Sequence, residues 1–282
     1  MSGSAWRAKA FTALLLAALP AGAPAQGRAP ADRFPDVAFV GTPMAVVTGM
    51  LTLAGVGEGD VVYDLGSGDG RIVIAAARLG ARGVGIELDR SLVAESRAHA
   101  DTAGVSGRVE FRQADIFETD LREATVVTLY LGRGLNERLR PILLRDLRPG
   151  SRVVSQAFDM GVWRPDSVVT VRGREFAATP VHLWIIPARV GGSWMLKLDE
   201  DVASGEQVGL TLTQRYQELA GTAGRGGSAV PLRDVRLRGD SLVFALGSRR
   251  FAGRVTDDEA RGHIVGGTGT GSRWRAVRTR RR

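Results

Sequence analysis

Short apolar runs alternate with amphipathic stretches over the first two thirds of the chain. The runs predict buried strands, and the stretches between them carry apolar residues at helical spacing. Two further strands follow with no helix between them. The expected strands lie at 61–65, 83–87, 109–113, 124–129, 152–157, 168–171 and 182–187. Alternation that ends in a hairpin predicts an α/β fold, a mostly parallel seven-stranded sheet with helices on both faces.

The expected helices have recognisable starts and stops. They lie at about 43–54, 71–80, 91–103 and 136–147. Thr42 is expected to cap the first helix, with Pro43 in its first turn, and Gly55 to end it. Asp89 is expected to cap the third helix. Pro141 is expected to bend or break the fourth, because proline removes a backbone donor.

The pattern changes after Val190, where no helical period follows. Short strands separated by glycine and aspartate turns are expected at 194–198, 208–212, 216–219, 235–237, 242–246, 251–255, 263–265 and 274–277. Residues 224–228 are expected to form a loop. The range 191–282 therefore predicts a small antiparallel β domain, a meander or a barrel.

The first 25 residues predict a secretory signal peptide. Arg7 and Lys9 precede the short apolar run 11–19, and an Ala-x-Ala site ends at Ala25. Residues 26–38 indicate a linker, so the first folded domain is expected at 39–190. We therefore expect export to the periplasm or the medium, with no transmembrane span in the mature chain. The alternatives are an uncleaved membrane anchor and a cytoplasmic protein.

Composition excludes some chemistry and locates the charge. The chain has no cysteine, and its three histidines show no metal-ligand spacing, so no metal is expected. The formal net charge is +8. Residues 26–190 are electrically neutral, and the excess lies in Arg7, Lys9 and residues 191–282, above all in the last ten. A basic tail is usually a solvated terminus, and no specific nucleic-acid partner is predicted.

The stretch 61–74 carries the clearest binding signal, a strand followed by a glycine turn and a helix. Gly66 and Gly68 allow a sharp turn and close approach of a ligand, and the helix that starts near Gly70 presents free N–H groups there. A dinucleotide site places a small residue where this chain has Arg71. Asp64, two residues before the first glycine, suits an ammonium group rather than a pyrophosphate. A zwitterionic ligand is therefore favoured.

On these residues the range 34–190 resembles the class I S-adenosylmethionine-dependent methyltransferases. The resemblance implies that S-adenosylmethionine is the cofactor and that the first motif cradles its methionine part, through Asp64, Gly66, Ser67 and Gly68. It further implies roles for four residues after the next two strands. Glu87 would bind both ribose hydroxyls, Asp115 the adenine amino group, and Leu88 and Ile116 would sandwich the adenine ring.

A finer resemblance is to small prokaryotic protein-lysine methyltransferase-like proteins. The segment 39–44, which contains Thr42, is similar to a motif that closes over the cofactor, and 126–131 and 152–155 are also similar. The acceptor implied is a protein lysine. Tyr130, at the end of the fourth strand, is the candidate for the acceptor pocket. That strand lacks the Asn/Asp-Pro-Pro-Tyr motif, which argues against an amide or adenine acceptor.

Three functions remain open from the sequence. The first is an active methyltransferase, of protein lysine or of a small molecule, with an appended β domain. The second is an exported S-adenosylmethionine-binding module without turnover. The third is a dehydrogenase-like dinucleotide binder. The oligomeric state is not predicted.

Overall fold

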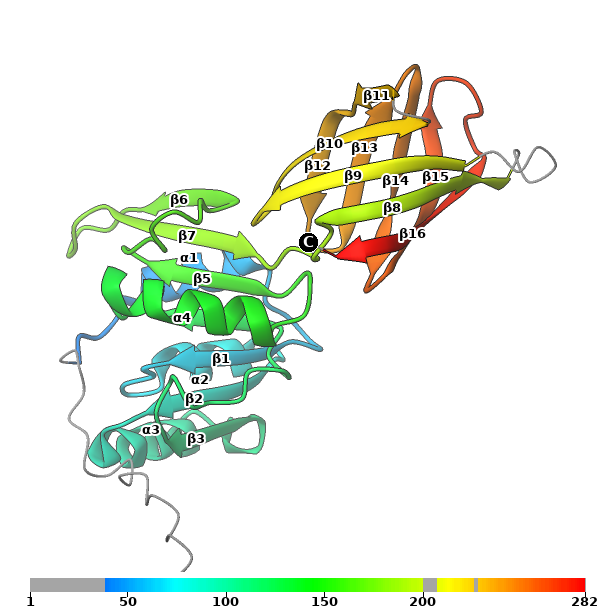
Figure 1. Ribbon diagram of the computed structural model, residues 1–282. Coiled ribbons are helices and arrows are strands. Elements are labelled where there is room, and N and C mark those ends of the chain that lie inside the picture. The colour runs from blue at the N-terminus through cyan, green and yellow to red at the C-terminus, as the bar shows by residue number, and fades with distance from the viewer. Residues whose placement is uncertain (1–38, 200–206, 226–227, 282) are drawn as a thin grey trace, which may run out of the picture.

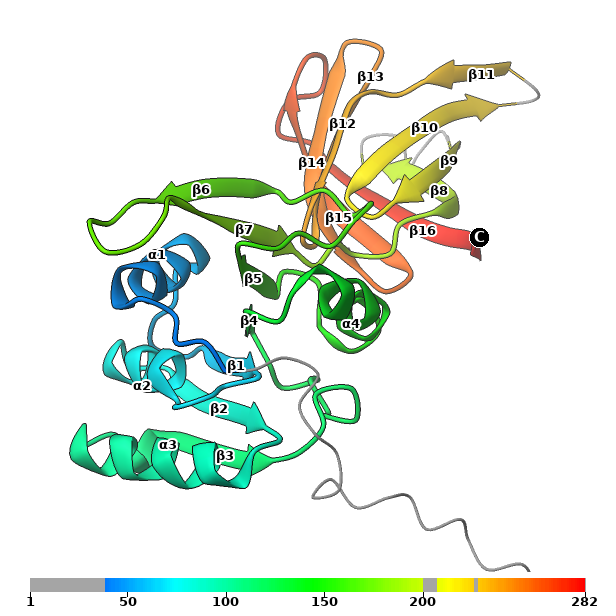
Figure 2. The same ribbon diagram turned by 90° about the vertical axis from the view of Figure 1, so that its left-hand side faces the viewer.

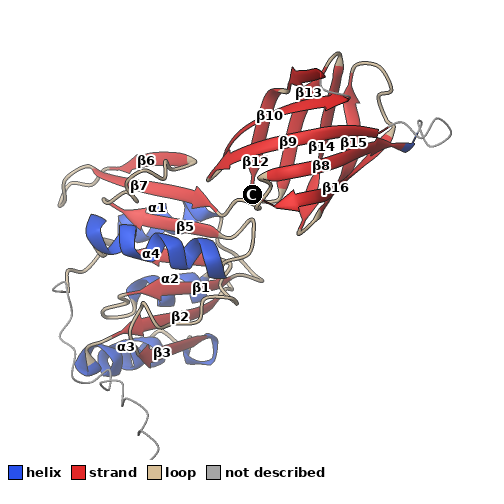
Figure 3. Cartoon of the chain, in the orientation of Figure 1, coloured by secondary structure: helices blue, strands red, loops and turns tan. Residues whose placement is uncertain are grey.

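The computed structural model describes residues 39–199, 207–225 and 228–281, and they form two β-sheets (Figure 1). Helices cover the first sheet, whereas the second is built from strands alone (Figure 3). Among the described helices, none combines the length and hydrophobicity needed to span a bilayer.

The first sheet has seven strands in the order β3-β2-β1-β4-β5-β7-β6. Neighbouring strands are parallel from β3 to β5, and β7 is antiparallel to both β5 and β6. The strands are β1 (Val61–Leu65), β2 (Arg82–Glu87), β3 (Val109–Gln113), β4 (Val126–Leu129), β5 (Arg152–Gln156), β6 (Ser167–Val171) and β7 (Thr179–Ile185). The predicted α/β class and the closing hairpin are confirmed.

Helices cover both faces of this sheet (Figure 2). They are α1 (Met44–Ala54), α2 (Arg71–Arg78), α3 (Arg90–Thr102) and α4 (Arg133–Asp146), and a 3₁₀ turn, η2, lies at Ser106–Arg108. Successive residues of β1 enter opposite cores, because side chains alternate along a strand. Val62 packs with α1 and α2, and Leu65 packs with Leu139 and Leu143 of α4.

Two predictions at helix ends are corrected. Thr42 does not cap α1: Pro43 takes the N-cap position with no side-chain bond, and the Thr42 hydroxyl donates to Gln156 Oε1 at 2.7 Å instead. Pro141 does not break α4, which runs through it. The ring of Pro141 is exposed, while Leu139 and Leu143 on either side are fully buried, so packing holds the helix together despite the lost backbone bond.

The helix ends at Gly55 and Asp89 agree with prediction. Gly55 has φ +62° and its N–H donates back to the last turn of α1. Asp89 accepts from the Ser91 N–H at 2.7 Å and caps α3.

The second sheet is antiparallel, with nine strands in the order β11-β10-β9-β8-β16-β15-β14-β13-β12. Its two ends, β11 and β12, are consecutive in the chain, and the Leu232 N–H between them donates to the Gly221 carbonyl at 2.8 Å. The sheet therefore forms a nearly closed barrel. The strands are β8 (Gly192–Leu198), β9 (Gln207–Arg215), β10 (Glu218–Arg225), β11 (Ser228–Pro231), β12 (Arg233–Arg238), β13 (Ser241–Leu246), β14 (Arg249–Thr256), β15 (Glu259–Gly266) and β16 (Arg273–Arg281).

Large side chains fill the inside of the barrel. Trp274, Phe244 and Phe251 pack together there, with Phe244 and Phe251 stacked at 4.7 Å between ring centroids. Two sequence expectations fail at the connections. The run at 216–219 is not one strand, because Tyr216 and Gln217 turn between β9 and β10, with Tyr216 at φ +58°. The loop expected at 224–228 is shorter, because Gly224 still pairs with Ala229.

The barrel lies at the end of the first sheet where the parallel strands begin (Figure 1). The antiparallel register pairs Ile185, the last residue of β7, with Arg152, the first of β5. Beyond this point the Ala188 N–H donates to the Gly239 carbonyl of the β12–β13 turn at 2.8 Å. A cavity of about 1060 Å³ lies between the two parts, lined by Leu144 and Arg148 on one side and by residues that include Thr213 and Val255 on the other.

The β9–β10 turn makes a specific contact with the first sheet. The Tyr216 ring stacks on Trp163 at 5.6 Å, and the Trp163 Nε1 donates to Gln217 Oε1 at 2.8 Å. The Gln217 amide in turn donates to the Arg164 carbonyl at 2.8 Å. Trp163 is fully buried, so its ring N–H depends on this partner.

We expect Gln217→Ala to lower the free energy of unfolding by about 1–3 kcal/mol, because it leaves the buried Trp163 N–H without an acceptor. Urea unfolding followed by tryptophan fluorescence measures the loss. Glu218→Ala, at the exposed neighbouring residue, is the control. Equal stability of the two variants would contradict the contact.

Candidate functional site

Three glycines shape the turn that follows β1. Gly66, Gly68 and Gly70 have φ values of +79°, +53° and +81°, which side-chain-bearing residues rarely adopt. The Gly66 and Ser67 N–H groups both donate to the Ile86 carbonyl, at 2.8 and 3.0 Å, and fix the turn to β2. Gly70 is the N-cap residue of α2, so the first turn of that helix faces the same place. The predicted strand–turn–helix unit is therefore present.

Glu87 holds the turn from the end of β2. One carboxylate oxygen accepts from the Gly68 N–H at 2.9 Å. The other accepts from the N–H groups of Leu88 and Asp89 at 2.8 and 3.0 Å. The side chain is buried, and the oxygen that accepts from Gly68 retains a lone pair for a further donor. Glu87 is thus both a part of the loop and an available acceptor for hydroxyl groups.

Asp115 lies in the turn after β3. Its carboxylate accepts from the Phe117 N–H at 2.8 Å, and its side chain is buried. Glu87 and Gln113 are paired at the ends of β2 and β3, which brings Asp115 to the same edge of the sheet. Leu88 and Ile116 follow the two acids and are half-buried. Their role beside an adenine ring stays a prediction.

Asp64 is the acid of the site with the least favourable electrostatic surroundings. Its side chain is buried, and burial raises its pKa to about 7, with the nearby charges of Glu87 and Asp69 adding to the rise. The Thr128 hydroxyl donates to Asp64 Oδ1 at 2.7 Å and opposes the rise. No basic side chain among the described residues contributes to the pKa of Asp64. An ammonium group from a ligand would supply the missing cation.

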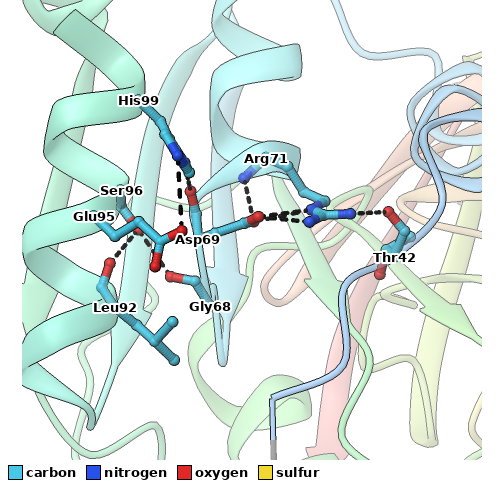
Figure 4. Close-up of polar contacts among 8 residues, drawn as sticks. All are labelled: Thr42, Gly68, Asp69, Arg71, Leu92, Glu95, Ser96 and His99. Carbon is cyan, nitrogen blue, oxygen red and sulfur yellow. Dashed lines mark hydrogen bonds and ion pairs between the residues drawn. The ribbon is translucent and has the colours of Figure 1, made fainter. Parts of the chain in front are cut away.

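A second acid of the turn, Asp69, is already paired (Figure 4). Arg71 donates to both of its oxygens, through Nε at 2.9 Å and Nη2 at 2.6 Å. Burial alone would raise the pKa of Asp69, but the Arg71 bonds outweigh it and hold the pKa below its usual range. The remaining nitrogen, Nη1, donates to the Thr42 carbonyl at 2.9 Å. This chain of contacts ties the segment before α1 to the glycine turn.

Close packing also holds the segment before α1 against the glycine turn. A side chain on Gly41 would come within 2.7 Å of the Arg71 guanidinium. The Phe39 ring lies directly against Gly68, so a side chain there would meet it. The segment from Phe39 to Thr42 therefore covers the turn. The similarity of this segment to a motif that closes over the cofactor agrees with that position.

The back of the turn rests on α3 (Figure 4). Ser96 donates to the Gly68 carbonyl at 2.8 Å, and His99 Nδ1 lies 3.1 Å from the Asp69 carbonyl. His99 is therefore a supporting residue of the loop. Within the described part of the chain, no group of three or more His, Cys, Asp or Glu side chains could hold a metal ion.

Aromatic rings lie beside the site at the ends of β4 and β5. Tyr130 and Phe158 stack at 6.1 Å with an angle of 22° between the rings. Ala157 has φ +64°, and the Phe158 N–H donates to the Gln156 carbonyl at 2.7 Å, which makes a γ-turn. The Asn136 amide donates to the Phe158 carbonyl at 3.2 Å. This strained turn aims Phe158 at Tyr130.

The structure thus gathers the predicted residues at the carboxyl edge of the sheet. Gly66, Ser67 and Gly68 surround the ends of β1 and β2, and Asp64 and Glu87 interact through their charges. Sequence reasoning missed Thr128, Asp69 and Arg71. For Thr128 a signal existed, since it is a buried hydroxyl on an otherwise apolar strand, and buried polar groups need partners. For the Asp69–Arg71 pair no pattern indicated the link to Thr42.

These residues fit a zwitterionic nucleoside cofactor. Asp64 is a buried carboxylate without a cation, and the buried Ser67 hydroxyl has no hydrogen-bond partner in the described structure. Glu87 offers a carboxylate to vicinal hydroxyls one strand away, as a ribose requires. A dinucleotide would instead bring its pyrophosphate to Asp64, which the charge of that residue opposes.

Comparison with known proteins agrees with this fit. Residues 64–167 match the model of the ANTKMT methyltransferase domain. A protein-lysine N-methyltransferase of Saccharolobus islandicus is 42% identical over 154 residues, which cover 54% of this chain and 95% of that protein. The mouse adenine nucleotide translocase lysine N-methyltransferase is 39% identical over 48% of this chain and 58% of its own length.

A solved structure extends the comparison to three dimensions. The RNA methyltransferase of Salinibacter ruber, in complex with S-adenosyl-L-homocysteine, is 57% identical and has a TM-score of 0.51, covering 54% of this chain and 96% of that one. The fold and the site define a class I S-adenosylmethionine-dependent methyltransferase. The chain belongs to that family, within the group that carries the ANTKMT methyltransferase domain, and its cofactor is S-adenosylmethionine.

We expect the affinity for S-adenosylmethionine to fall about tenfold per pH unit below pH 7, because the ammonium group of the cofactor needs the ionised form of Asp64, whose pKa is about 7. Asp64→Asn should bind weakly at about pH 8 and lose this pH dependence. Calorimetry across pH measures both. Glu58→Gln, at an exposed acid that precedes β1 at the opposite edge of the sheet, is the control.

The raised pKa of Asp64 also predicts how the stability of the cofactor-free protein depends on pH. A raised pKa means that the folded state holds the Asp64 proton more tightly than the unfolded chain does. That contribution is complete below about pH 4 and is lost as the pH rises through about 7. Cofactor-free Asp64→Asn should therefore be more stable than the parent at about pH 8. If Asp64→Asn were less stable than the parent at this pH, Asp64 would not carry an uncompensated charge in the folded protein.

Proposed function

We propose that this methyltransferase modifies the ε-amino group of a protein lysine. The observation that carries the proposal is the match to the Saccharolobus islandicus protein-lysine N-methyltransferase, which extends over nearly the whole of that protein. The mouse translocase methyltransferase is also a lysine N-methyltransferase by name, although the chain spans only 58% of its length.

The acceptor side of the site supports a lysine. Tyr130 and Phe158 present stacked rings at the carboxyl ends of β4 and β5, and Phe158 is 38% exposed. Flat aromatic faces accommodate an aliphatic stem and attract its ammonium end. Tyr130-Leu131-Gly132 follows the fourth strand, without the Pro-Pro pair of enzymes that act on planar amide nitrogens.

Positioning accounts for most of the chemistry in this proposal. The bound cofactor supplies an electrophilic methyl group on a sulfonium, which the amine attacks in line. Asp64 and Glu87 would hold the ammonium group and the ribose of the cofactor and so orient it for transfer. A lysine has a reference pKa near 10.4 and must lose its proton first, and a low-dielectric pocket beside a cation lowers that pKa. The chain contributes aromatic walls there.

RNA is the second candidate acceptor. It is favoured by the Salinibacter ruber protein, described as an RNA methyltransferase and 57% identical over almost its whole length. Two further functions are compatible with the site, transfer to a small molecule and binding without turnover. Transfer of a labelled methyl group from S-adenosylmethionine to separated protein, RNA and small-molecule pools distinguishes all four. Label in lysine after acid hydrolysis of the protein pool is the expected outcome.

We expect Tyr130→Ala and Phe158→Ala each to lower kcat/KM for the protein acceptor about tenfold, because the lost ring contact is worth roughly 1–2 kcal/mol. The dissociation constant for S-adenosylmethionine should not change. Val162→Ala, at an exposed residue of the same segment, is the control. Unchanged kinetics in both aromatic variants would show that the two rings are not part of the acceptor site.

Export is a separate proposal, based on the sequence of residues 1–25, which lie outside the described structure. An exported methyltransferase must obtain its cofactor outside the compartment that makes it. Cell fractionation with sequencing of the mature N-terminus tests the location. Recovery of the uncleaved chain in the cytoplasm would contradict export, and an uncleaved chain in the membrane fraction would indicate an anchor.

A further inference from the structure

One connection of the first sheet carries both a ring of the proposed acceptor site and a contact with the barrel. It is the segment 157–166 between β5 and β6, which we name the acceptor segment. Phe158, near its start, stacks on Tyr130. Trp163, five residues later, is fully buried and stacks on Tyr216 of the barrel. A short piece of chain therefore joins the two aromatic contacts.

Helix α4 holds the part of the acceptor segment next to Phe158. Asn136 donates to the Phe158 carbonyl at 3.2 Å and to the Asp159 carbonyl at 3.3 Å. Arg140 Nη1 donates to the next carbonyl, that of Met160, at 2.6 Å. Asn136 and Arg140 lie four residues apart and so share a face of the helix. The backbone that carries Phe158 is therefore held at three successive carbonyl groups.

The barrel holds the other end of the acceptor segment. Tyr216 belongs to the β9–β10 turn, yet its ring packs with the methyltransferase core that contains Trp163 instead of the barrel core. The Arg140 guanidinium lies over the same ring, 6.0 Å from its centroid. Gln217 accepts from Trp163 Nε1 and donates to the Arg164 carbonyl, each at 2.8 Å. Arg140 therefore contacts both the acceptor segment and the barrel.

A second part of the barrel acts on the last residue of the acceptor segment, Asp166. The Asp166 carboxylate accepts from the Ile185 N–H at 2.8 Å and so ties the segment to β7. Desolvation raises the pKa of Asp166, and both the Ile185 bond and the charge of Arg238, on β12, oppose the rise. The β9–β10 turn and β12 thus both meet this end of the segment.

Phe158 depends on support of this kind. Ala157, directly before it, has φ +64°, a conformation that is costly for a residue with a side chain. Phe158 is 38% exposed, so burial alone does not fix its ring. A strained backbone persists only where the surrounding contacts determine it. For this segment the contacts come from α4 at one end and from the barrel at the other.

We infer that the β9–β10 turn of the barrel positions the acceptor segment, with Tyr216 and Gln217 acting through Trp163 on the orientation of Phe158. The consequence for the acceptor rests on the proposed function, which places that ring in the acceptor site. Tyr216 and Gln217 are positioning residues, because they act through another side chain. The glycine turn of the cofactor site is held by β2 and α3 instead. The barrel turn should therefore affect acceptor binding and leave the affinity for S-adenosylmethionine unchanged.

The first test is hydrogen exchange in the full chain, read by mass spectrometry in the peptide that spans 157–164. Tyr216→Ala should raise exchange there about tenfold, because it removes the ring that stacks on Trp163. Tyr216→Phe keeps the ring and should exchange as the parent does. Gln217→Ala removes both hydrogen bonds to the segment and should raise the same exchange. Phe251→Leu loosens the barrel core without touching the turn, and it is the control.

The second test separates KM from kcat in the acceptor pool that the parent labels. Tyr216→Ala should raise the apparent KM for the acceptor about fivefold, less than the direct loss of a ring of the site, and Tyr216→Phe should restore it. The dissociation constant for S-adenosylmethionine should stay that of the parent. A parent-like KM for Tyr216→Ala would overturn the inference.

The exchange experiment needs no methyl transfer, so it decides the positioning by itself. Unchanged exchange at 157–164 in Tyr216→Ala, or an equal rise in Phe251→Leu, would overturn the inference. Absence of label in protein lysine from the parent would contradict the proposed function instead, and the exchange result would still stand.

Discussion

The site is built around one constraint: the buried carboxylate of Asp64 has no basic side chain acting on it among the described residues. Asp64 lies one residue before the end of the core strand β1, where its neighbours Tyr63 and Leu65 are fully packed, and its own side chain is buried. Thr128 provides one hydrogen bond, and the surrounding charges are negative. Burial of an ionised group without a partner is unfavourable. The folded protein therefore holds this position at a cost that a zwitterionic cofactor removes when it binds.

The carboxylates at the edge of the sheet differ in their tasks because their partners differ. Asp69 is satisfied by Arg71 and serves structure, since the pair also reaches the Thr42 carbonyl. Glu87 is held by three backbone N–H groups and serves both the loop and the ligand. Asp64 alone is left for recognition of charge. Three acids of similar burial thus have three roles, set by which donor each one faces.

The sequence predicted the architecture well where periodicity and turn residues agreed. The strands at Val61–Leu65 and Val109–Gln113 were placed to the residue, because turn residues bound each of them closely on both sides. The errors fall where a tertiary partner overrides a local preference. Thr42 has good capping chemistry, but Gln156 lies within reach across the fold, and no local pattern indicates it. Tyr216 looks like a strand residue, yet its contact with Trp163 holds it in a turn.

Pairing of the barrel strands also bears on the order in which the chain can fold. β8 is the first strand of the barrel and β16 the last, and they are neighbours in the sheet, with Trp274 opposite Leu198. The barrel has therefore no complete core until β16 has been synthesised, whereas every strand of the methyltransferase sheet is available by Ile185. Contacts between such distant segments form slowly. A nascent chain would hold a folded cofactor site next to an unfinished barrel with open edges, the stage at which it most needs protection from aggregation.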